Sequence, residues 1–336
     1  MAVYMDYNAT TPLAPEVISD ITQSLSEHWA NPSSPHDAGV RARQVVEEAR
    51  QQVATAIGDK AGDVVFTSGG TEANNMVILG SLEFYVSTGR SGTPHVVTSD
   101  TEHDAVTEPI RSLETRRLCT VTWLSCADGG RVDPAAVVDA VTPDTCLVSV
   151  MMANNETGVL NDVEEIGRRL ARLPNRSHIW FHTDSAQTIG KVDVDVARIG
   201  ADFVTIVGHK LYGPRVGALW TSPLGQTARP ASAGGGGACV ALLRGGGQER
   251  RLRPGTENTP LARGLGTACR LAAQRLQRDQ AHMRQLRDLL EQRLLETGVA
   301  ERINLRGSPR LPNTSSVVLA GEESGRAVLV CSCAAA

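Results

Sequence analysis

The chain has 336 residues, of which 41% are hydrophobic and 21% charged, and its formal net charge is −4 at pH 7. This size and composition are typical of a globular protein with one large domain and a smaller additional part. Acidic and basic side chains are interspersed and form no basic block, which argues against a nucleic-acid-binding protein.

The cysteines and the N-terminus indicate the compartment. Seven cysteines are scattered without a CxxC pair, which fits free thiols in a reducing compartment better than disulfides or a zinc site. No apolar run in the sequence approaches the length of a membrane span. The N-terminus has neither a basic leader nor an apolar signal region, so we expect a cytosolic protein that does not bind membranes.

The first sixty residues are predicted to be mainly helical. Residues 1–12 read as a short strand followed by turn residues. Pro15 starts an amphipathic helix that is expected to reach about Trp29, and the polar residues 31–34 end it. A second helix is predicted over residues 38–57, because apolar side chains recur there at helical spacing.

From Val64 onward, short β-rich runs alternate with segments of helical pattern. The runs cover residues 64–67, 95–99, 119–124, 146–152, 178–183 and 203–207. Such alternation predicts an α/β fold with a mainly parallel sheet flanked by helices on both faces. Ligands of such sheets bind outside the carboxyl ends of the strands, so polar residues should gather just after each run.

Three of these strand ends carry residues that could bind a ligand, and each of them also has a purely structural interpretation. The glycines of Ser68-Gly-Gly-Thr71 could let a helix N-terminus seat a phosphate, or the stretch could simply cap that helix. His103 could lie over a flat cofactor ring, or it could cap the next helix. Asp184 needs a cationic partner, which could be a protonated pyridine nitrogen or an arginine. The polar stretch Ala153 to Gly158 is hard to explain as core.

Lys210 closes the last β-rich run, in the stretch Val207-Gly-His-Lys210. A lysine wedged between buried strands is poorly solvated, so its neutral amine becomes available as a Schiff-base nucleophile. The alternative is a turn lysine that reaches solvent. Further along, residues 229–244 are glycine-rich and are predicted to form a flexible insertion. A long helix is expected over residues 261–295, with an apolar stripe along it.

Taken together, the motifs resemble the pyridoxal-phosphate cysteine desulfurase family over nearly the whole chain. The matching stretches are VYMDYNATTPL, NPSS, SGGTEANN, EHD, ANNETG, HTDSAQ, VGHKLYGP, GGGQERRLRPGTEN and LPNT. Two of them, VGHKLYGP and GGGQERRLRPGTEN, are most similar to the selenocysteine lyases within this family. The resemblance implies a type I pyridoxal-phosphate transferase fold. It also implies a large cofactor-binding domain over residues 1–260, with residues 1–30 packing on the small domain. Residues 261–336 would form a connecting helix and an incomplete C-terminal small domain.

The resemblance also implies a role for each site residue. Lys210 would bind the cofactor aldehyde and act as a base, Asp184 would pair with the pyridine nitrogen, and Gln187 would bond the phenolate oxygen. His103 would stack on the ring and assist proton transfer, with Asn155 near the ring and the substrate. The phosphate would be held by Gly70, Thr71 and His209, and by Thr256 of the partner in a homodimer with shared sites.

Two departures from the family pattern bear on function. Val207 stands where many desulfurases carry a phosphate-binding serine, three residues before the lysine. The family pattern continues beyond LPNT with a catalytic cysteine loop and an arginine, whereas this sequence ends at Ala336, and Cys331 and Cys333 are not expected to replace that cysteine.

The resemblance as a whole implies decomposition of L-selenocysteine to L-alanine and reduced selenium. The alternatives are a cysteine desulfurase or related aminotransferase, and a silent protein that binds cofactor and dimerises.

Overall fold

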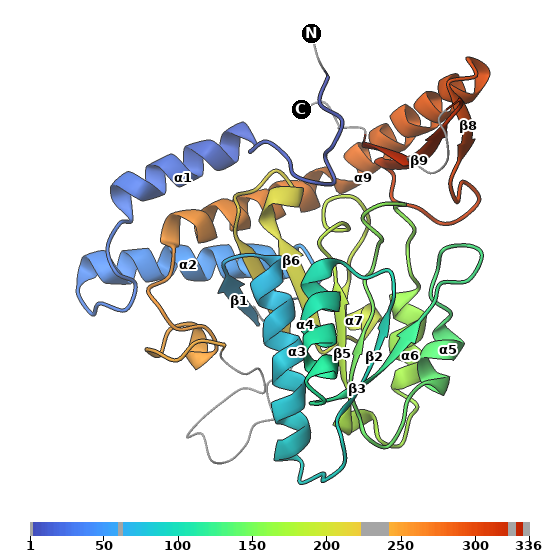
Figure 1. The fold of residues 1–336 in the computed structure, drawn as a ribbon. Helices are drawn as coiled ribbons and strands as arrows, with labels where there is room; N and C mark the ends of the chain where they lie inside the picture. The colour runs from blue at the N-terminus through green and yellow to red at the C-terminus, as the bar shows by residue number, and fades with distance from the viewer. Residues whose placement is uncertain (1–2, 60–62, 223–241, 322–326, 332–336) are drawn as a thin grey trace.

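The computed structural model describes residues 3–59, 63–222, 242–321 and 327–331. Within these ranges, seven strands form the main sheet in the order β1-β7-β6-β5-β4-β2-β3 (Figure 1). They are β1 (Val64–Thr67), β2 (His95–Ser99), β3 (Thr120–Leu124), β4 (Thr145–Ser149), β5 (Trp180–Asp184), β6 (Phe203–Val207) and β7 (Gly217–Thr221). The strands from β3 to β6 pair in parallel, and β7 pairs antiparallel with both β6 and β1. The predicted α/β fold with a mainly parallel sheet is confirmed.

Helices cover both faces of this sheet. One face packs on α3 (Gly70–Ser87) and α4 (Asp104–Thr115), around a core in which the ring of Trp180 stacks on Phe84 and contacts Phe203 at a tilt. The other face packs on α2 (Asp37–Thr55), α5 (Pro134–Asp139), α6 (Val163–Leu170), α7 (Val196–Ile199) and part of α9 (Thr259–Glu296). Because β4, β5 and β6 lie between these two layers, both faces of each strand are buried, as their sequence predicts.

The long helix α9 connects the main sheet to a second, smaller sheet. It lies against α1 (Pro15–Glu27) and α2 and then reaches the strands β8 (Ala300–Ile303) and β9 (Thr314–Leu319) (Figure 1). The third strand of this sheet, β10 (Ala327–Cys331), pairs antiparallel with β9. Among the described residues, no helix is both long and apolar enough to cross a membrane. The domain boundary at residue 260 stays a prediction.

One predicted element is wrong. The described part of the N-terminal segment, residues 3–12, forms a turn and irregular chain in place of a strand. Its hydrogen bonds explain why, because Thr11 donates to the carbonyl oxygen of His209 and Ala14 to that of Tyr212, and neither bond belongs to a strand ladder. Cys331 ends β10. Cys333 and most of the predicted insertion at residues 229–244 lie outside the described residues.

Candidate active site

A cavity of ≈ 240 Å³ lies where the strands of the main sheet end. Eight of the nine predicted site residues line it, and they come from five separate stretches of the chain: Gly70, Thr71, His103, Asn155, Asp184, Gln187, His209 and Lys210. Parallel strands place their carboxyl ends at one edge of the sheet, which is why residues so far apart in sequence meet here. The roles assigned to these residues stay predictions, but their convergence is a finding.

The first turn of α3 forms one end of the cavity. Gly69 precedes this helix and no side chain caps it, so its first N–H groups stay outside the helical hydrogen-bond ladder. Gly70 is required by close packing, since a Cβ there would lie 2.6 Å from Cγ2 of Val207. Val207 thus supports the loop by apolar contact. An uncapped helix N-terminus of this kind is suited to hold a phosphate.

His209 stands beside this helix end. Its Nδ1 lies 3.0 Å from Oγ1 of Thr10 in the N-terminal segment. Burial lowers the pKa of His209 below its ordinary value, and the neighbouring charges of Lys210 and Arg215 lower it further. His209 is therefore neutral near pH 7, and one ring nitrogen can act as a hydrogen-bond donor towards an anion.

Lys210 and Gln187 place two donors at the same point. Lys210 ends the short 3₁₀ turn Gly208–Lys210, and its Nζ donates to the backbone oxygen of Asn8 at 2.8 Å. Gln187 Nε2 donates to the same oxygen at 3.0 Å, while Lys191 Nζ donates to Gln187 Oε1 at 3.1 Å. The Lys191 contact fixes the Gln187 amide with its NH₂ group towards the cavity. The oxygen of Asn8 thus sits where an amine and an amide donor converge.

Asp184 forms the opposite wall. The residue is 7% exposed, and each carboxylate oxygen accepts one hydrogen bond, from Nδ2 of Asn74 at 2.8 Å and from the N–H of Ala186 at 2.9 Å. In the part of the chain that the structure describes, no arginine or lysine forms an ion pair with Asp184. The arginine partner that was the alternative to a pyridine nitrogen is therefore not found there. A buried carboxylate that faces a cavity in this state is suited to bind a cationic group.

His103 combines both interpretations of its motif. Its Nδ1 accepts from the N–H of Ala105 at 3.0 Å and so caps α4, while the side chain also lines the cavity. The cap leaves Nε2 as the nitrogen that carries the proton of the neutral ring. The preceding Glu102 is buried and accepts from the N–H of Met151 at 2.7 Å and from Ser99 at 2.9 Å. Glu102 therefore joins the ends of two strands beneath His103.

The loop after β4 divides its two asparagines between structure and cavity. Oδ1 of Asn154 accepts from the N–H groups of Glu156 and Thr157, which closes the turn. Asn155 lines the cavity, and its backbone oxygen accepts from Nδ2 of Asn8 at 3.1 Å. The motif therefore presents Asn155, the residue predicted from the family resemblance, while Asn154 holds the loop.

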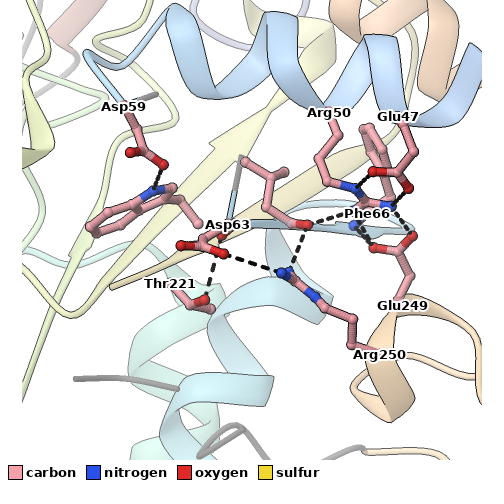
Figure 2. Close-up of polar contacts among 10 residues, drawn as sticks. Glu47, Arg50, Asp59, Asp63, Phe66, Thr221, Glu249 and Arg250 are labelled. Carbon is pink, nitrogen blue, oxygen red and sulfur yellow. Dashed lines mark hydrogen bonds and ion pairs between the residues drawn. The ribbon is translucent and has the colours of Figure 1, made fainter. Parts of the chain in front are cut away.

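Thr256 is the one predicted site residue that does not line the cavity of its own chain; its side chain is exposed. The segment that carries it is anchored to the free edge of β1 (Figure 2). Glu249 accepts from the N–H of Phe66 at 2.8 Å and forms a two-fold contact with Arg50, with both N–O distances 2.8 Å. Arg50 and Arg250 both donate to the oxygen of Val64. These side chains satisfy backbone groups that an edge strand otherwise exposes.

The charges of this anchor are mutually dependent. Burial alone would lower the pKa of Arg50, but the ion pair with Glu249 outweighs it and raises that pKa. The backbone from Glu249 to Arg251 is left-handed, with φ of 45°, 55° and 68°. Non-glycine residues adopt this conformation only where neighbouring contacts hold it. A second contact joins Arg253 to Glu72 in the first turn of α3, at 3.0 Å, so the same segment is tied to the cavity's helix.

Sequence reasoning missed two residues of the site. Asn74 lines the cavity from the second turn of α3 and binds Asp184. Its place four residues after Gly70, on the same side of the helix, was a usable signal. Asn8 brings the N-terminal segment to Lys210 and also bonds Thr314 and Asn313 near the start of β9. No local pattern indicates that contact.

The chain is similar to proteins of a known family. The aminotransferase class-V family profile matches residues 3–332. The chain belongs to this family. Selenocysteine lyase of Xenopus tropicalis is 44% identical over 336 residues, which cover 94% of this chain and 76% of that protein. Selenocysteine lyase of Homo sapiens is 42% identical over 355 residues, covering 98% of this chain and 78% of that protein.

More distant relatives and solved structures agree. The mitochondrial cysteine desulfurase of Saccharomyces cerevisiae is 39% identical over 322 residues, covering 95% of this chain and 60% of that protein. A NifS-like protein of known structure superposes with a TM-score of 0.84 at 32% identity, covering 94% of this chain and 81% of that one. SspA in complex with cysteine gives a TM-score of 0.78 at 30% identity, covering 95% and 84%. The pyridoxal-phosphate fold predicted from the motifs is confirmed.

Members of this family use pyridoxal 5′-phosphate, and the cavity fits that cofactor. The amine of Lys210 would be placed to react with its aldehyde, and the uncapped N–H groups of α3 and the NH₂ group of Gln187 could donate hydrogen bonds to its phosphate and phenolate oxygen. Asp184 supplies the acceptor for a protonated ring nitrogen, and it stands without a cationic partner among the described residues. The chain is an enzyme of the pyridoxal-phosphate-dependent class.

Proposed function

We propose that this enzyme decomposes L-selenocysteine to L-alanine and reduced selenium. The observation that carries the proposal is the placement of Lys210 and Asp184 on one small cavity, in a chain that is 42–44% identical to selenocysteine lyases over almost its whole length. In the reaction the Cβ–Se bond breaks and a proton is added at Cβ. Selenium leaves as the element, or as selenide where a thiol reductant supplies two electrons.

The residues divide the work as follows. Bound pyridoxal 5′-phosphate supplies the electron sink that makes the substrate Cα–H acidic. Lys210 Nζ carries the cofactor and is the base placed to take the Cα proton. Asp184 keeps the ring nitrogen protonated, and Gln187 donates to the phenolate oxygen. His103, with its proton on Nε2, also lines the cavity and is placed to move a proton there.

A cysteine desulfurase is the second candidate. The support for it is the likeness to desulfurases and to SspA, whose structure holds cysteine. The same cavity would then cleave a Cβ–S bond. The lyase is favoured because the identity to selenocysteine lyases is higher, at 42–44% against 39–41% for the cysteine desulfurases of yeast, rat and mouse.

One assay distinguishes these functions. The protein is reconstituted with pyridoxal 5′-phosphate and given selenocysteine and cysteine in parallel, with alanine measured from each and Lys210→Ala as the blank. We expect alanine and selenium from selenocysteine at a much higher rate than alanine from cysteine. Equal or faster turnover of cysteine would show a desulfurase, and no alanine from either would show a cofactor-binding protein without turnover.

We also propose a homodimer in which Thr256 of each protomer binds the cofactor phosphate of its partner. Its exposure, and the anchoring of its segment to β1 and α3, support this role, because a donor lent to another chain must be both accessible and fixed. Thr256→Val should weaken cofactor binding several-fold without altering dimerisation, which sedimentation and a cofactor titration would measure. A monomer, or unchanged affinity in the variant, would contradict the proposal.

A further inference from the structure

A chain of hydrogen bonds runs from the cavity into the interior of the main sheet. Asn74 Nδ2 lies 2.8 Å from Asp184 Oδ2, and Thr205 Oγ1 lies 2.6 Å from Asn74 Oδ1. His182 Nε2 lies 3.0 Å from Thr205 Oγ1, and Ser149 Oγ lies 2.8 Å from His182 Nδ1. The side chains of Asn74, Thr205, His182 and Ser149 are fully buried. They come from α3, β6, β5 and β4, so the chain crosses three neighbouring strands.

Two directions of the protons complete every hydrogen bond between Ser149 and Asp184 Oδ2. Burial lowers the pKa of His182 to about 4, so the ring is neutral near pH 7, with one nitrogen as donor and the other as acceptor. Each hydroxyl has one proton to donate. If Asp184 is ionised, every bond points towards it, from Ser149 through His182, Thr205 and Asn74. If Asp184 carries a proton on Oδ2 and donates it to Asn74, the Asn74 amide is turned over and every bond points away.

The far end of the chain selects the first arrangement. With the bonds reversed, the ring of His182 would donate to Ser149, and the hydroxyl proton of Ser149 would need another acceptor. Within the described ranges, Oγ of Ser149 has no hydrogen-bond partner other than His182, and the residue is fully buried. A buried donor without a partner is costly. The reversed hydrogen-bond chain is therefore disfavoured at Ser149, and with it an Asp184 proton on Oδ2 that points towards Asn74.

Glu102 is a neighbouring buried carboxyl group that lacks such a hydrogen-bond chain, and its pKa is raised. Burial raises the pKa of Glu102 to about 8, and the charge of Asp184 raises it as well. Only Oε1 of Glu102 accepts hydrogen bonds, and its Oε2 has no partner among the described residues. Asp184 accepts on both oxygens. Asp184 and Glu102 are buried acids that repel each other's charge. Asp184, which ends the hydrogen-bond chain, therefore keeps the negative charge.

We propose that the hydrogen-bond chain Ser149–His182–Thr205–Asn74 keeps the Asp184 carboxylate ionised and so fixes its bond to the protonated ring nitrogen of the cofactor. Thr205, His182 and Ser149 are then positioning residues that never touch the cofactor. The proposal rests on the role given to Asp184 in the proposed function. It predicts that removing the Thr205 hydroxyl inside the sheet weakens the recognition of the cofactor ring nitrogen in the cavity.

The test compares Thr205→Val, which removes the hydroxyl at constant shape, with Thr205→Ser, which retains it. Each protein is titrated with pyridoxal 5′-phosphate and with its analogue that carries CH in place of the ring nitrogen. The wild type and Thr205→Ser should both prefer the natural cofactor, and Thr205→Val should lose on the order of tenfold of that preference, with little change for the analogue. An equal loss for both ligands would overturn the proposal, because it indicates a structural effect alone. No preference in the wild type would instead overturn the role of Asp184.

A second measurement works on the cofactor-free protein. In ¹⁵N-histidine-labelled protein, His182 should be a single tautomer with the proton on Nε2, and Ser149→Ala should give a mixture of tautomers because neither direction is then favoured. His95 is the internal control, since it also lies between two threonine hydroxyls in the same sheet, at 2.8 and 2.9 Å, away from the cavity. A proton on Nδ1 of His182 in the wild type would overturn the proposal.

Discussion

The two walls of the cavity are built in different ways. The Asp184 wall is a strand end held by buried side chains from α3, β6, β5 and β4, and its contacts form one connected network. The Lys210 wall lies at a 3₁₀ turn, and its contacts come from the N-terminal segment, through the backbone oxygen of Asn8 and the hydroxyl of Thr10. The first wall can keep a ring in place, whereas the second holds an amine by a contact that a ligand can replace. Changes in the Asp184 wall should therefore affect how the cofactor ring is held. Changes in the Lys210 wall should affect the covalent attachment of the cofactor and the proton transfer.

The largest effect is expected at the Lys210 wall. Lys210→Ala removes the amine that carries the cofactor and takes the Cα proton, so alanine formation should fall at least about 10³-fold and the covalent absorbance of the cofactor should disappear. Lys191→Met is the matched comparison, because Lys191 orients Gln187 without lining the cavity, so this variant should keep the covalent absorbance and lose much less turnover. A Lys210→Ala protein that keeps the covalent absorbance would contradict the account.

The next largest effect belongs to the Asp184 wall. Asp184→Asn keeps the size of the side chain and removes the charge, so turnover should fall about 10²–10³-fold while the cofactor still attaches to Lys210. Asp202→Asn serves as control, since Asp202 is equally buried but is paired with Arg176 away from the cavity. Comparable losses in the two variants would show that a buried charge, and not its place at the ring, matters.

The Asp184 wall also predicts a pH dependence of stability. The folded pKa of Glu102, about 8, lies above its ordinary value of 4.5, so the folded protein keeps a proton that the unfolded chain releases between these pH values. Its contribution to the free energy of unfolding is therefore present below pH 4.5 and is lost as the pH rises to about 8, by up to about 1.4 kcal/mol per pH unit. Glu102→Gln should flatten this slope in denaturant titrations at several pH values. An unchanged slope would mean that Glu102 is ionised in the folded state.

The smallest effect is expected from the N-terminal segment. Asn8→Ala removes side-chain bonds to Thr314 and Asn313 and should lower the free energy of unfolding by about 1 kcal/mol. Because Asn8 belongs to the Lys210 wall, the preference for the natural cofactor over its CH analogue should stay as in the wild type. A change in that preference would show that the two walls are coupled.

The sequence predicted the Lys210 and Asp184 positions because both follow β-rich runs, and the ends of parallel strands meet at one edge. Runs such as residues 64–67 and 203–207 were predicted with the bounds that the structure gives. The buried chain behind Asp184 was not predicted. Ser149, His182 and Thr205 lie inside strands, where a single polar residue is compatible with β propensity, and their contact depends on the register between strands.

The N-terminal segment shows a second limit. Residues 1–12 have the composition of a strand and a turn, but the conformation of the described residues 3–12 is set by bonds to residues about two hundred positions away, at His209 and Tyr212. Local propensity does not contain that information. The same holds for Glu249, whose charge is buried at the edge of β1 only because Arg50 lies there on α2. Contacts of this kind require the fold before they can be assigned.

The attachment point of the cofactor tests the central claim most directly. The sequence has three lysines, Lys60, Lys191 and Lys210, so the protein can be loaded with pyridoxal 5′-phosphate, reduced with borohydride, digested and mapped by mass spectrometry without ambiguity. The account predicts one pyridoxyl group per chain, on Lys210. A pyridoxyl group on Lys191 or Lys60, or an unmodified chain, would contradict it.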